Sequence, residues 1–153
     1  MKESAADPLF KARLACFASI AKAMEGFLTK FQSPAPLAPF LYDDVTELIR
    51  NLMQHVDKSN VLEAADTPRK LIAVDLKDDK NLLSRDKIGV GIGAVSEVLK
   101  AKCSNLQKME FRMQCQKFIV ALIGKIIERS PKIFSDSFMF SCFTSLFFSK
   151  QCS

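Results

Sequence analysis

The chain has 153 residues, of which 48% are hydrophobic and 25% charged, a composition typical of one globular domain. This hydrophobic share excludes an intrinsically disordered chain. The formal net charge of +5 permits contact with nucleic acid or another acidic surface, but many proteins without such partners are equally basic.

The first predicted element is an amphipathic helix that ends near residue 31. Asp7 is a suitable cap, and the fixed φ of Pro8 suits the first helical turn. Gly26 could bend or break the helix. We interpret its apolar stripe as a core-facing surface rather than a coiled-coil or partner-binding seam, because no charge pairing beside it is obvious. The stripe recurs at spacings of four and three and consists of Phe10, Leu14, Phe17, Ala21, Met24, Leu28 and Phe31, widened by Leu9, Ile20 and Phe27.

A proline-rich connector and a second amphipathic helix follow. Residues 33–39, SPAPLAP, must be extended because each proline restricts the residue before it. The second helix is predicted over residues 41–57, with acidic residues near its start that suit the positive end of the helix dipole. A short helical turn after Ser59 is expected to end at Thr67 and Pro68. The stripe of the second helix consists of Leu41, Val45, Leu48, Ile49, Leu52, Met53 and Val56.

The second half of the chain begins with its one plausible strand. That strand, LIAVDL at residues 71–76, is rich in apolar and β-branched residues. A helix is predicted over residues 94–102, and a longer, central helix capped by Ser104 and Gln107 is predicted to about Arg129. The sequence therefore predicts a mainly α fold, a single-domain bundle of four to five helices with at most one or two short strands.

Residues 132–153 differ in character from the rest of the chain. This tail is rich in phenylalanine and serine, and its apolar stretch is too short for a membrane-spanning helix, so we expect no integral membrane insertion. The interpretation that we favour is a tail foreign to the domain, which leaves residues 1–131 as the helical domain. The alternative is docking of a partner or contact with a membrane surface, for which the candidate residues are Phe138, Phe140, Phe143, Phe147 and Phe148.

The segment GVGIG, residues 89–93, raises the question of a phosphate-binding loop. A dinucleotide fingerprint needs a buried strand, then G-x-G-x-x-G, then a helix. Here the third glycine comes one residue early, and the preceding NLLSRDKI is too polar for a buried strand. The Gly-Lys-Ser/Thr element of a P-loop is also absent. We interpret the segment as a lead-in to the following helix.

No catalytic or metal-binding constellation emerges from the sequence. His55 is the only histidine and has no cysteine near it with which to build a zinc site, so we expect a partly exposed surface histidine. Asp75, Asp78 and Asp79 fit a solvated turn better than a metal site. The five cysteines form no C-x-x-C pair, and we expect reduced, small apolar groups. The sequence therefore predicts a protein that is not an enzyme and that needs no cofactor or metal.

Basic residues are spread along the polar faces of the helices. Tyr42 is the only tyrosine and tryptophan is absent, so stacking on nucleic-acid bases is weakly supported. At most, we expect loose phosphate contacts, for which Lys102, Lys108 and Arg112 are the candidates. A polar N-terminus without a secretory signal favours a nuclear or cytoplasmic location.

Several long motifs resemble hAT-superfamily transposase-like proteins of vertebrates. The first is FLTKFQ at residues 27–32, which precedes the proline-rich connector and PFL at residues 39–41. Residues 70–100, MEFRMQC at 109–115 and ERSP at 128–131 follow in the same order. The resemblance covers residues 3–131 and implies helical material outside the catalytic core of such enzymes. It assigns no catalytic acid, because none of the carboxylates of this chain matches one.

Two functions follow as hypotheses. The first is a non-catalytic helical fragment of a transposase-derived protein that supports protein association or weak DNA contact within a larger assembly. The alternative is a stand-alone helical adaptor that binds a partner protein through an apolar helix face or through the phenylalanine-rich tail.

Overall fold

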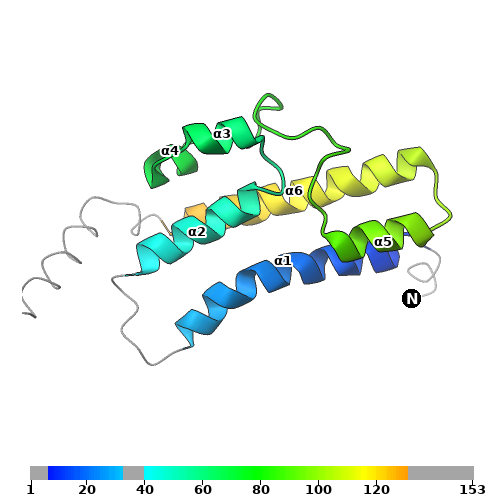
Figure 1. Cartoon of the computed structure of the whole chain (residues 1–153), viewed down its shortest axis with the longest axis horizontal. Coiled ribbons are helices and arrows are strands. Elements are labelled where there is room, and N and C mark those ends of the chain that lie inside the picture. The colour runs from blue at the N-terminus through cyan, green and yellow to red at the C-terminus, as the bar shows by residue number, and fades with distance from the viewer. Residues whose placement is uncertain (1–6, 33–39, 131–153) are drawn as a thin grey trace, which may run out of the picture.

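The computed structural model describes residues 7–32 and 40–130, and these residues form six helices (Figure 1). The predicted mainly α fold class is confirmed. In this part of the chain β-structure is limited to one isolated antiparallel bridge between Asp57 and Leu82. The helices are α1 (Phe10–Phe31), α2 (Leu41–Met53), α3 (Ser59–Ala64), α4 (Pro68–Ile72), α5 (Ile92–Lys100) and α6 (Asn105–Arg129).

The two long helices, α1 and α6, set the length of the bundle, α2 packs against both of them, and α5 packs against α1. Figure 1 shows α5 beside the N-terminal half of α1 and α2 beside its C-terminal half. Helix α6 runs behind α2 in this view. The helices α5 and α1 are antiparallel, because Gly91 lies against Ser19 whereas Gly93, further along α5, lies against Ala15. Both α2 and α1 contact α6, but the predicted central position of this helix is not confirmed, because Leu106, Met109 and Phe118 are exposed.

One hydrophobic core joins all six helices. Phe111 of α6 is the largest fully buried side chain, and Ile49, Leu52 and Met53 of α2 are also fully buried. The apolar stripe predicted for the second helix is therefore largely confirmed. On α6, the buried face consists of Phe111, Cys115, Ile119 and Ile123.

The predicted helix start is confirmed for α6, whereas α1 begins later than predicted, at Phe10, with Leu9 at its N-cap and no side-chain cap. The carboxylate of Asp7 accepts a hydrogen bond from the Leu9 amide at 2.9 Å and pairs with Arg13 at 3.2 Å. At the start of α6, the Ser104 hydroxyl accepts from the Gln107 amide, and the Gln107 side chain accepts from the Ser104 amide at 2.9 Å. Helix α1 continues through Gly26 without a break.

The predicted strand at residues 71–76 is wrong. Thr67 and Pro68 begin a helix instead of ending one, because proline fits the first helical turn and the Thr67 hydroxyl accepts a hydrogen bond from the Lys70 amide. Leu71 of this helix, α4, is fully buried. The Asp75 carboxylate then accepts from the Lys77 amide at 2.9 Å and holds a turn. A lone strand here would lack a neighbouring strand to pair its backbone groups.

Candidate interaction surface

The apolar stripe predicted to face the core lies mostly on the surface of α1. Phe10, Leu14, Phe17 and Leu28 are between 43% and 52% exposed, and Ala21 is exposed as well. Met24 is partly buried. The prediction that this stripe packs on the core is therefore wrong for these exposed residues, and it is confirmed for the widening residues Leu9 and Ile20, which are buried.

A neighbouring face of α1, lined by smaller side chains, contacts the core instead. It consists of Leu9, Ala12, Cys16 and Ile20, all buried. Alanine and cysteine at its centre let α5 and α6 approach α1 closely, whereas phenylalanine side chains at those positions would hold the helices apart. Helix α1 thus has two adjacent apolar faces, and within residues 7–32 and 40–130 the other helices cover only one of them.

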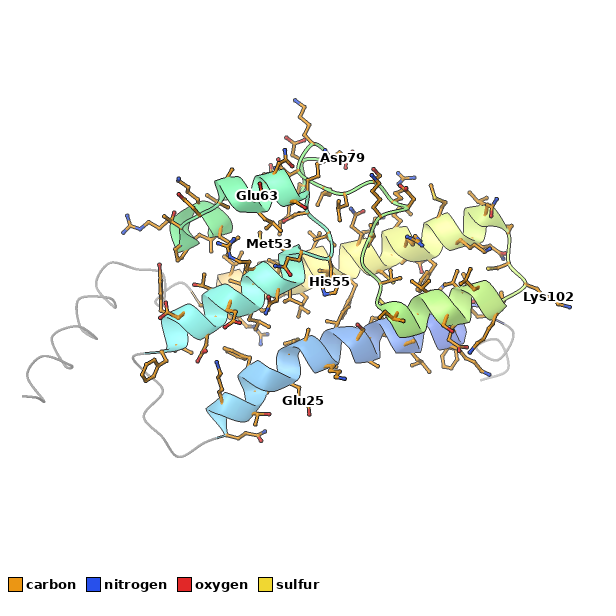
Figure 2. All side chains as sticks on the ribbon, in the orientation of Figure 1. Glu25, Met53, His55, Glu63, Asp79 and Lys102 are labelled. Atoms are coloured by element: carbon orange, nitrogen blue, oxygen red, sulfur yellow. The ribbon has the colours of Figure 1, made fainter. Side chains whose placement is uncertain are left out.

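We call the uncovered surface the α1 apolar face, and α6 extends it. The ring of Phe118, itself 40% exposed, meets the ring of Phe17 edge to face with centroids 4.8 Å apart. Exposed polar residues line the opposite edge of the face. Figure 2 shows one of these, Glu25, on the side of α1 that points away from the other helices. The face consists of Phe10, Leu14, Phe17, Ala21 and Leu28 of α1 and Phe118 of α6.

The glycines of residues 89–93 allow this segment to pack closely against neighbouring parts of the chain. Gly91 has a φ of 87°, and a Cβ there would lie 2.5 Å from the hydroxyl oxygen of Ser19. The Gly89 amide donates to the His55 carbonyl at 2.8 Å, and Nδ1 of the half-buried His55 donates to the Gly89 carbonyl at 2.9 Å. The segment leads directly into α5, as predicted, and its glycines let it lie against both α1 and His55.

The three candidate phosphate contacts lie at one end of the molecule. Lys102 is exposed on the turn between α5 and α6 and points outward in Figure 2. Lys108 and Arg112 lie one turn apart on α6 and are half-buried. The Arg112 guanidinium already donates to the Asp86 carbonyl. Lys102 and Lys108 are thus the more available cations of the three. The candidate partner-binding residues Phe138, Phe140, Phe143, Phe147 and Phe148 lie outside the described residues.

No signal in the sequence pointed to the buried carboxylate of Asp57. This side chain is 2% exposed, and neither of its oxygens has a hydrogen-bond partner in the described structure. It lines a pocket of about 360 Å³ together with Arg50, Gln54 and Glu63. The Arg50 guanidinium donates instead to the carbonyls of Leu62 and Ala65, at 3.2 and 2.8 Å. Burial raises the pKa of Asp57 to about 6.

The described cysteines are free thiols, and two of them meet in the core. Cys16 of α1 and Cys115 of α6 are buried and hydrogen-bonded to each other. This hydrogen bond, and then burial, raises the pKa of the Cys115 thiol far above its ordinary value. A thiol held protonated in this way is a poor nucleophile. The same hydrogen bond lowers the pKa of the Cys16 thiol. Both side chains are buried and form part of the apolar core.

Neither a metal site nor a membrane span is found in the described part of the chain. Within residues 7–32 and 40–130, no cluster of three His, Cys, Asp or Glu side chains is placed to bind a metal ion. Over the same residues, no helix combines the length and apolarity needed to cross a membrane. Comparison with protein-family models, curated proteins and solved structures finds no match to the chain.

Proposed function

We propose that this protein is a non-catalytic protein-association module that docks a helix on the α1 apolar face. The observation that carries the proposal is a stripe of large apolar side chains, at coiled-coil spacing, that the bundle itself leaves exposed. Scattered exposed apolar residues are ordinary, but a contiguous row along one helix is typical of a binding surface. The resemblance to transposase-like proteins supports a place for this module within a larger, DNA-associated assembly.

A synthetic helix tests the proposal directly. The probe is a fluorescent peptide as long as α1, with leucine at every a and d position and mixed charges elsewhere. We expect micromolar binding by fluorescence anisotropy, and weakening by about tenfold or more in Phe17→Glu, because the new carboxylate would be desolvated in the docked complex. Leu14→Glu is expected to have the same effect.

The matched control is Ile92→Glu, which places the same charge at an apolar residue of α5 that is 91% exposed. This variant should bind the peptide as the parent chain does. Circular dichroism checks that each variant remains helical. Equal binding by the parent, Phe17→Glu and Leu14→Glu would show that the α1 apolar face is not the docking surface.

The proposal includes weak, non-specific DNA contact near the start of α6. Combined replacement of Lys102, Lys108 and Arg112 by alanine should weaken binding to an arbitrary duplex. The slope of log affinity against log salt concentration is expected to fall by up to about three, one for each phosphate contact that is lost. Combined replacement of three lysines in and after α4, Lys70, Lys77 and Lys80, is the control. An unchanged salt slope in the first variant would remove the DNA part of the proposal.

A further inference from the structure

We propose that the helix docked on the α1 apolar face is α1 of a second copy of this chain, packed antiparallel. This inference rests on the proposed function and names its partner. Helix α1 has 22 residues and is therefore about 33 Å long. Its apolar stripe keeps a heptad repeat over that length, with Met24 half-buried and the other described positions exposed, and such a repeat is the pattern that buries one helix against another.

The repeat allows a symmetric pairing in which the large ring of Phe17 faces the small side chain of Ala21. Leu14, Ala21 and Leu28 occupy a positions, and Phe10, Phe17 and Met24 occupy d positions. In an antiparallel pair each a position faces a d position of the other helix. The register centred between Phe17 and Ala21 sets Phe17 against Ala21 of the second copy, Leu14 against Met24 and Phe10 against Leu28. Every apolar residue of the described stripe then has an apolar partner.

Charge complementarity selects this register. The residues that follow the d positions Phe10, Phe17 and Met24 are Lys11, Ala18 and Glu25, all exposed. In the register above, Lys11 faces Glu25 of the second copy, and Glu25 faces the second copy's Lys11. Ala18 faces Ala18 of the second copy at the two-fold axis. The small alanine side chains leave room for the two helices to approach each other. The dimer therefore contains two symmetric ion pairs.

The other arrangements lose these pairs. A shift of the antiparallel register by one heptad sets Lys11 against Ala18 or Gln32. A parallel arrangement would place Arg13, Ile20 and Phe27 opposite the charged edge, but Ile20 is buried in the core and Arg13 already pairs with Asp7. Of the arrangements compared, only the antiparallel register pairs the apolar residues of the stripe and also pairs Lys11 with Glu25.

Charge exchange in the full-length chain tests this geometry. Sedimentation equilibrium at low salt should show a concentration-dependent dimer, twice the 17.1 kDa of one chain. Lys11→Glu and Glu25→Lys should each weaken dimerisation by about tenfold, because each sets like charges together at two symmetric places. The double variant Lys11→Glu/Glu25→Lys should restore it to near the parent value. Lys22→Glu, on the same helix but outside the stripe and its charged edge, is the control and should change nothing.

Each outcome decides the inference. Loss in both single variants with recovery in the double variant supports the antiparallel dimer, since only residues that face each other are rescued by exchange. Dimerisation that is equally strong in the parent, the two single variants and the double variant overturns the inference. A chain that binds the leucine probe but stays monomeric overturns the second copy as partner and leaves the helix-docking function standing. A chain that neither dimerises nor binds the probe overturns both. Circular dichroism confirms that the single variants are folded; for Lys11→Glu this matters because Glu97 of α5 lies near Lys11.

Discussion

Replacing Phe111 with alanine is expected to lower the free energy of unfolding by about 3–5 kcal/mol. Phe111 is 1% exposed and is the largest fully buried side chain, in the N-terminal half of the long helix α6. Truncation removes its apolar contacts and leaves a cavity that the surrounding helices fill only in part. Urea unfolding followed by circular dichroism measures the change, at a protein concentration below that of any self-association.

The control for this prediction is Phe118→Ala on the same helix. Phe118 makes an edge-to-face contact with Phe17 but is 40% exposed, so its loss should cost about 1 kcal/mol. The two variants make the same chemical change at two places on one helix that differ in burial. Similar losses of unfolding free energy in the two variants would contradict the difference in burial between Phe111 and Phe118.

Asp57→Asn is expected to stabilise the protein at pH 7.5 by up to about 3 kcal/mol. Burial without a hydrogen-bond partner raises the pKa of Asp57 from an ordinary 3.8 to about 6. A shift of about two units corresponds to about 3 kcal/mol of penalty on the charged form. Because the folded pKa is raised, the favourable contribution of Asp57 is fully present below pH 3.8 and is lost as the pH rises through about 6. Asparagine removes the charge at a nearly unchanged volume.

The pH dependence distinguishes this cause from a general gain in packing. The difference in unfolding free energy between Asp57→Asn and the parent should be largest at about pH 7.5 and shrink at about pH 4.5, where the parent carboxyl is mostly protonated. Urea unfolding at both pH values measures it. Asp79→Asn, at an exposed carboxylate labelled in Figure 2, should stay within about 0.5 kcal/mol of the parent. A gain from Asp57→Asn that is equal at both pH values would reject the electrostatic explanation.

Local signals in the sequence predicted most of the helices correctly. Ser104 with Gln107 marked the start of α6 because capping depends only on residues a few positions apart, whereas α1 begins at Phe10, beyond the cap predicted at Asp7. The same kind of signal was misjudged at Thr67 and Pro68, where a proline that begins a helix was taken as one that ends it. The apolar run at residues 71–76 then suggested a strand, since short apolar runs do not distinguish a buried helix from a strand.

The sequence by itself determined the described helices other than α4, the capped start of α6 and the amphipathic character of α1. The tertiary structure alone decided which face of α1 is buried, because that choice depends on how closely α5 and α6 can approach Ala12 and Cys16. Likewise, the isolation of Asp57 follows from Arg50 being bound to the carbonyls of Leu62 and Ala65. Periodicity measures how apolar a face is, but burial depends on the shape of the helices that pack against it.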